Sequence, residues 1–212
     1  MNAPCPAPSL PIRRAAARPV TFSTTLPATW LLLALAACGG GGDAAAPAPA
    51  PPAAAAPSPA AATASTCSLP NFAASALARI NQYRAAGANC RTDGVFAPAS
   101  ALAWNNKLTQ AADGHSQDMA VQNYFSHISA DGRTFDARIT AAGYVWSRVG
   151  ENIAAGYASV DEVVDGWMAS DGHCANIMEP RFTEVGLACV PRPPGTTTNF
   201  SNYWTMDLAL PR

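Results

Sequence analysis

The chain has 212 residues and a formal net charge of −1, and 49% of its residues are hydrophobic while only 13% are charged. Removing residues 1–37, whose only charges are three arginines, takes the formal charge to −4 and leaves Lys107 as the single lysine. Because binding to a phosphate backbone requires clustered lysine and arginine, this composition argues against a nucleic-acid partner.

The first 37 residues have the pattern of an export signal. Three arginines precede the apolar run 26–37, which is shorter than the roughly 20 residues of a membrane-spanning helix. The run ends in Leu-Ala-Ala-Cys at 35–38, which resembles the lipobox of bacterial lipoproteins. This resemblance implies cleavage before Cys38, a lipid anchor on Cys38 and a location outside the cytoplasm, at the outer membrane if the host is Gram-negative. The alternative is an ordinary signal peptide and a secreted protein.

Residues 38–66 are predicted to form a disordered tether. They are rich in glycine, alanine and proline, and Asp43 is their only charged residue. Such a segment offers too little apolar area to offset the entropy of ordering. Its reach lies between about 30 Å as a coil and about 85 Å as extended polyproline, enough to hold a domain clear of a membrane.

Residues 67–212 form the part of the chain that is able to bury a core. This part contains Cys67, Cys90, Cys174 and Cys189, and an even number of cysteines in an exported domain predicts two disulfides. Of the three possible pairings we favour Cys67 with Cys90 and Cys174 with Cys189, since each closes a short loop. A zinc site is a weaker alternative because the chain has no Cys-x-x-Cys motif.

Helical periodicity dominates the first part of this domain. Apolar residues recur at helical spacing within 72–87, 105–119 and 135–143, and the first and third of these stretches end at a glycine. A fourth helix is predicted to begin at a capping box, in which Ser159 and Glu162 satisfy each other's backbone donors.

Strand patterns follow the helices. The runs 184–190 and 202–208 alternate bulky apolar residues with smaller ones, and the proline-rich stretch between them predicts a hairpin. A third strand is expected at 151–155. Helices around a small antiparallel sheet make the domain α+β, with the sheet as the middle layer.

The candidates for chemistry are the three histidines and one acid. His115 lies on the buried stripe of the second helix, where a hydrogen-bonded core role is the first interpretation. His127 lies in a turn, and His173 follows the fourth helix. Glu151 enters a strand among apolar residues, so its carboxylate requires a partner. These residues are equally compatible with a structural clamp and with a His/Glu site.

Several motifs together resemble the CAP superfamily, which is also called SCP-like and includes cysteine-rich secretory, antigen 5 and pathogenesis-related 1 proteins. In chain order the motifs are HSQDMA at 115–120, NYFSH at 123–127, AGY at 142–144, GENIAAG at 150–156, GWMASDGHCANIM at 166–178 and FTEVGLACV at 182–190. The resemblance covers residues 72–208. It implies a three-layer α-β-α sandwich with a central antiparallel sheet.

The resemblance also implies a cleft with two histidines and two acids. Compared motif by motif, His127 is similar to the first histidine, Glu151 to the first acid and His173 to the second histidine. The second acid is expected three residues after the tryptophan of the fourth helix, where this chain has Ser170. The neighbouring Asp171 is the candidate substitute.

A metal is implied by the same comparison. In some relatives the cleft binds a divalent cation, so His127, His173 and Glu151 are the candidate ligands for zinc or another divalent ion. His115 belongs to a motif common in bacterial relatives and is expected to line the same cleft. Whether any cofactor binds depends on the missing second acid.

We expect a binding function more than an enzymatic one. No serine lies in a Gly-x-Ser-x-Gly elbow, and the domain's cysteines are assigned to disulfides. The first hypothesis is therefore a monomeric, lipid-anchored module that binds a small or lipid-like ligand or a protein partner. The alternative is a hydrolase that activates water on a bound metal and acts on envelope or extracellular substrates.

Overall fold

The computed structural model describes residues 64–212. The predicted signal peptide, the lipidation site Cys38 and most of the predicted tether lie outside these residues. Within the described part of the chain, no helix is both long and apolar enough to cross a membrane. Ser65 already belongs to the domain, because its N–H donates to Asp113 and its carbonyl accepts from the N–H of Cys189.

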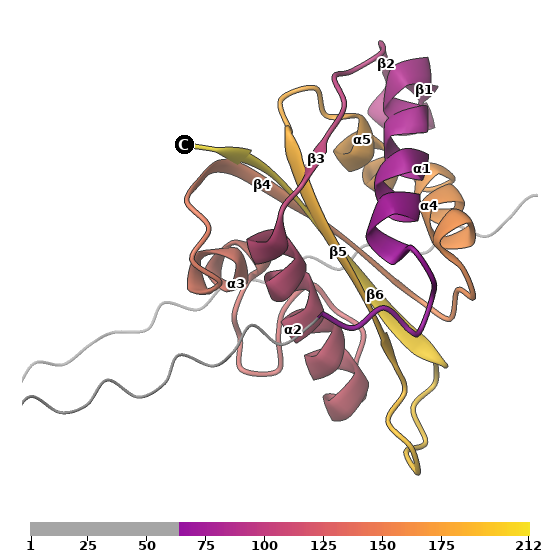
Figure 1. The fold of residues 1–212 in the computed structure, drawn as a ribbon, viewed down its shortest axis with the longest axis vertical. Coiled ribbons are helices and arrows are strands. Elements are labelled where there is room, and N and C mark those ends of the chain that lie inside the picture. The colour runs from indigo at the N-terminus through magenta and orange to yellow at the C-terminus, as the bar shows by residue number, and fades with distance from the viewer. Residues whose placement is uncertain (1–63) are drawn as a thin grey trace, which may run out of the picture. The chain divides into compact units, whose positions relative to one another are not determined.

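The described chain contains both helices and strands (Figure 1). The helices are α1 (Phe72–Ala86), the 3₁₀ helix η1 (Arg91–Asp93), α2 (Asn106–Gln122), α3 (Phe135–Ala141), α4 (Val160–Met168) and α5 (Asp171–Met178). The strands are β1 (Ala88–Asn89), β2 (Val95–Phe96), β3 (Ala103–Trp104), β4 (Trp146–Ala155), β5 (Glu184–Pro191) and β6 (Asn202–Pro211).

The four predicted helices are present as α1, α2, α3 and α4. Asn105 caps α2 by accepting hydrogen bonds from the first backbone N–H groups of the helix. Ser159 caps α4 by accepting from the N–H of Glu162, whereas the Glu162 carboxylate accepts from Ala158, one residue before the predicted partner. Helix α5 was not predicted, because the stretch around His173 was interpreted as the loop that follows α4.

The main sheet has the strand order β3-β5-β6-β4. Strand β6 pairs antiparallel with both β5 and β4, which confirms the predicted hairpin and the predicted third strand. The two-residue strand β3 pairs parallel to β5, so the sheet is antiparallel except at this edge. Strand β4 forms the other edge and is twice as long as predicted, since pairing with β6 continues back to Trp146.

Helices cover both faces of this sheet, as expected for the predicted α-β-α sandwich. Figure 1 shows α2 and α3 on one side of the strands and α1, α4 and α5 on the other. Along β6, Trp204, Met206 and Leu208 point into the core beneath α1, α4 and α5. The residues between them, Thr205 and Asp207, point to the opposite face, which α2 and α3 cover.

A buried arginine near the end of α1 binds the C-terminal end of α5. The guanidinium of Arg84 donates to the carbonyls of Ser100, Ile177, Glu179 and Phe182 at 2.7–3.0 Å. Two of these carbonyls belong to the C-terminal end of α5, where helices leave backbone acceptors without partners. Arg84 therefore caps α5 from a neighbouring helix and fixes its position against the sheet.

The two disulfides connect other partners than we predicted. Cys67 pairs with Cys189 and Cys90 pairs with Cys174, with Cα–Cα distances of 5.3 and 5.5 Å. The favoured pairings were wrong because they assumed local loops. The N-terminal segment instead runs beside β5, where Thr66 forms a bridge with Cys189, and η1 packs against α5.

Peptide mapping checks this connectivity. Trypsin cleaves after Arg84, Arg91 and Arg181 and separates the four cysteines. Without reduction, we expect the peptide with Cys67 to remain linked to the one with Cys189, and the Cys90 peptide to the Cys174 peptide. Mass spectrometry that found Cys67 linked to Cys90 would contradict the structure.

Candidate functional site

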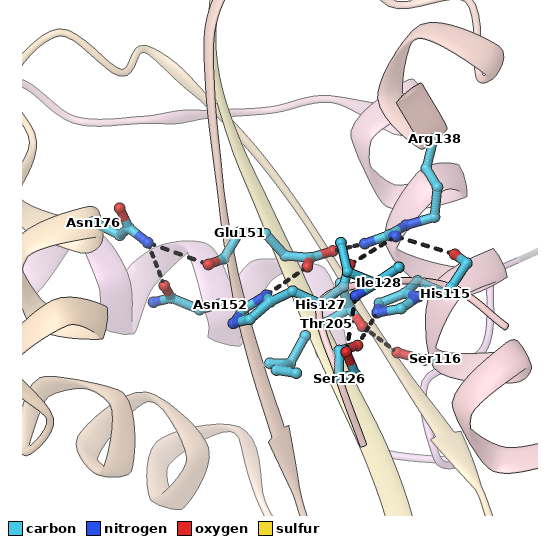
Figure 2. Close-up of polar contacts among 12 residues, drawn as sticks. His115, Ser116, Ser126, His127, Ile128, Arg138, Glu151, Asn152, Asn176 and Thr205 are labelled. Carbon is cyan, nitrogen blue, oxygen red and sulfur yellow. Dashed lines mark hydrogen bonds and ion pairs between the residues drawn. The ribbon is translucent and has the colours of Figure 1, made fainter. Parts of the chain in front are cut away.

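Glu151 is the centre of the candidate site (Figure 2). Its side chain is fully buried on β4, and its two carboxylate oxygens have different partners. Oε1 lies 2.7 Å from Nδ1 of His127, and Oε2 accepts a hydrogen bond from the guanidinium of Arg138. The carboxylate that the sequence predicted to require a partner therefore has both a cation and an imidazole.

Arg138 connects α3 to the loop that carries His127. One of its terminal nitrogens donates to the carbonyls of His127 and Arg133 and to the hydroxyl of Ser129, at 3.0–3.1 Å. Its other terminal nitrogen donates to Glu151. The same buried guanidinium thus fixes the loop backbone and neutralises the acid to which the loop's histidine is bonded.

The geometry also suggests which nitrogen of His127 carries the proton. Because Glu151 is paired with Arg138, its carboxylate is an acceptor, so Nδ1 of His127 donates to it. The opposite nitrogen, Nε2, then has a free lone pair in the neutral ring. The side chain of His127 is 46% exposed, so this acceptor is accessible from solvent.

His173 approaches the same edge strand from the other layer. It lies on α5, and burial, together with the nearby His127, lowers the pKa of its imidazole. Its carbonyl accepts from the amide of Asn152, which follows Glu151 and faces the opposite side of β4. Asn176 donates to the carbonyl of Glu151 and to the side chain of Asn152 (Figure 2). The structure thus brings His127, Glu151 and His173 to one region.

Neither Ser170 nor Asp171 contributes a side chain to the cluster around Glu151. Ser170 is the N-cap residue of α5. The carboxylate of Asp171 turns toward η1, where it accepts from Arg91 and from the backbone and hydroxyl of Thr92. Asp171 therefore stabilises the contact between η1 and α5 and does not replace the second acid.

His115 lies behind the loop and not on the surface of the site. It is fully buried on α2, and its Nε2 lies 2.9 Å from the carbonyl of Ser126, the residue before His127. Burial lowers the pKa of its imidazole, although the negative charge of Glu151 opposes this effect. A neutral His115 that donates to Ser126 supports the turn that presents His127.

Two residues of the site were missed by sequence reasoning. Arg138 lies within the predicted helix 135–143, next to the buried Ile139, and an arginine among the apolar residues of that helix was the available signal for the partner of Glu151. Asp207 lies directly opposite Glu151 on β6 and is almost fully buried. The available signal for Asp207 was that it is an acid within the otherwise apolar end of the predicted strand 202–208.

The carboxylate of Glu151 is not free to bind a divalent metal. Both oxygens of Glu151 are engaged, Nδ1 of His127 is engaged, and the adjacent guanidinium of Arg138 repels a cation. Within residues 64–212, no group of three His, Cys, Asp or Glu side chains is arranged to hold a metal ion. Of the three candidate ligands, the imidazoles of His127 and His173 keep a free nitrogen, but Glu151 does not complete the set for zinc or another divalent cation.

The fold and the site together define a disulfide-bonded α-β-α sandwich with a buried glutamate and two histidines at its sheet edge. Residues 77–208 match the family described as CAP: Cysteine-rich secretory protein family. The chain belongs to this family, which confirms the resemblance on which the site residues were assigned.

Similar proteins are found in bacilli. The chain is 43% identical over 84 residues to the uncharacterized protein YkwD and 34% identical over 103 residues to the uncharacterized membrane protein YlbC, both of Bacillus subtilis (strain 168). These matches cover 39% and 49% of the chain and 32% and 29% of the relatives. An extracellular protein containing a SCP domain from Bacillus anthracis str. Ames is 29% identical with a TM-score of 0.46, over 53% of this chain and 34% of that one. The similarity thus spans about a third of each relative.

Removing the cation from the site tests its structural importance. We expect Arg138→Met to lower the free energy of unfolding by about 3–5 kcal/mol, because it leaves the buried carboxylate of Glu151 without a compensating charge. Chemical denaturation measures this change. The control is Arg133→Met, which removes an exposed ion pair with Asp131 and should cost no more than about 1 kcal/mol. Equal effects of the two variants would contradict the prediction.

Proposed function

We propose that the protein is an extracytoplasmic binding module whose ligand contacts His127. The observation that carries this proposal is the contrast between a half-exposed imidazole and its fully buried carboxylate partner. Because the N–H at Nδ1 donates to Glu151, the accessible Nε2 is suited to accept a hydrogen bond from a ligand. This acceptor favours a neutral ligand that carries a hydroxyl or amide donor.

Exposed apolar side chains lie in the same loop as His127. Phe125 and Ile128 are 46% and 45% exposed, and the ring of Phe125 is 5.8 Å from the ring of Phe200. Large apolar side chains that remain exposed close to a polar acceptor are common features of ligand sites. An amphipathic, lipid-like molecule with a hydroxyl group has the complementary chemistry.

The proposed location is the cell envelope, outside the cytoplasm. Two disulfides in a domain of this size are typical of proteins in oxidising compartments. The relative from Bacillus anthracis is described as extracellular and YlbC as a membrane protein. These observations, with the lipobox pattern that ends in Cys38, support a domain attached to the envelope by a lipid anchor.

Membrane fractionation tests the anchor. We expect Cys38→Ala to move the protein from the membrane fraction to the soluble fraction, because the residue that carries the lipid is lost. Cys5→Ala is the matched control and should leave the protein in the membrane fraction. If the Cys38→Ala variant also stays in the membrane fraction, the prediction of a lipid anchor on Cys38 is wrong.

Ligand titration tests the binding site. We expect the full chain to bind dodecanol about fivefold more tightly than dodecyl methyl ether, because only the alcohol donates a hydrogen bond, worth about 1 kcal/mol, to His127. His127→Ala should abolish this preference, whereas Val95→Ala, at an exposed residue on β2, should keep it. Calorimetry that detects no saturable binding of dodecanol would contradict the proposal.

A further inference from the structure

Asp207 is a buried acid placed directly beside the candidate site. In the register of the sheet it lies opposite Glu151 on β4 and opposite Gly186 on β5. Helix α2 packs so closely on this row that a Cβ atom at Gly186 would lie 2.1 Å from the backbone nitrogen of Thr109. The Asp207 side chain is consequently enclosed between the sheet and α2, with 1% of the residue exposed.

Within residues 64–212, no N–H or O–H group donates a hydrogen bond to the carboxyl group of Asp207. The nearby guanidinium of Arg138 donates to Glu151 and to the loop, and its Nε donates no hydrogen bond within the described chain. His115 of α2 is directed to Ser126, and His127 is directed to Glu151. Asp207 is therefore not one half of an ion pair.

The charges at this place do not balance if both acids are ionised. The buried groups would be two carboxylates, Glu151 and Asp207, and one guanidinium, Arg138. A buried carboxylate without a cation or a donor costs several kcal/mol, and two adjacent carboxylates relieve this cost by sharing one proton. Since Glu151 is already paired with Arg138, the proton belongs on Asp207.

We propose that Asp207 is a protonated acid that donates a hydrogen bond to Glu151, and that it is a positioning residue for His127. Glu151 then accepts from Arg138, from His127 and from Asp207. These three donors fix the carboxylate as an acceptor, which keeps the proton of His127 on Nδ1 and leaves Nε2 free. The inference deepens the proposed function, although it concerns the protein without ligand.

The charges around Asp207 also favour its protonated form. Burial, followed by the negative charge of Glu151, raises the pKa of Asp207 well above its ordinary value, and Arg138 opposes this only in part. Unfolding releases the acid to an ordinary pKa of about 4. The native state therefore holds more protons than the unfolded state above this pH. The stability contributed by the bound proton is complete below about pH 4 and is lost as the pH rises toward the native pKa of Asp207.

Replacing Asp207 by asparagine tests whether its carboxyl group is protonated in the native state. In the full chain, Asp207→Asn keeps the shape and supplies an N–H donor to Glu151, whereas Asp207→Ala removes the donor. We expect the unfolding constant of the wild type, relative to that of Asp207→Asn, to rise by up to tenfold per pH unit between pH 5 and 7. Asp131→Asn, at an exposed acid, should show no such rise.

The position of the proton on His127 is the second measurement. In ¹⁵N NMR spectra at pH 8, we expect wild type and Asp207→Asn to have the His127 proton on Nδ1, and Asp207→Ala to have a mixture of tautomers. Equal spectra for Asp207→Asn and Asp207→Ala would show that Asp207 does not position His127.

A measurement on the wild-type protein avoids any dependence on folding of the variants. The ¹³C resonance of the Asp207 carboxyl group at pH 7 distinguishes a carboxylic acid from a carboxylate. A carboxylic acid supports the proposal and a carboxylate overturns it. Neither result depends on dodecanol binding, so this proposal and the proposed function can fail separately.

Discussion

The buried carboxylate of Glu151 is the constraint around which the site is organised. A charge in this position is stable only if it is neutralised and hydrogen-bonded. Arg138 supplies the cation and at the same time binds three groups of the loop that precedes it. The position of His127 therefore depends on α3 and on the edge strand β4, and not on the conformational preference of its own loop.

The edge position of β4 explains how two layers contribute to one site. Successive side chains of a strand point to opposite faces, so Glu151 faces α2 and α3 whereas Asn152 faces α5. The amide groups of Asn152 and Asn176 hold α5 against the strand, and the buried disulfide between Cys174 and Cys90 links the same helix to the residue before η1. His127 and His173 thus approach β4 from opposite sides of the sheet.

The sequence predicted those features that depend on local periodicity. The helical stripes, the cap at Ser159 and the hairpin are encoded by neighbouring residues, and each was recognised. The disulfide pairings join residues 122 and 84 positions apart, which no local pattern reveals. Arg138 and Asp207 were missed for the same reason, because their roles arise only when α3 and β6 are placed beside β4.

The placement of acids determines which ligands suit the site. The family resemblance implies a second acid three residues after the tryptophan of α4, but Ser170 occupies that position and Asp171 is engaged by η1. The acid that lies beside Glu151 is Asp207, which is buried behind it. An acid in this internal position adds no negative charge to the exposed face of His127. Compared with a site that has two acids near its surface, this one has less attraction for a cation, which agrees with the neutral hydrogen-bond donor that we propose as its ligand.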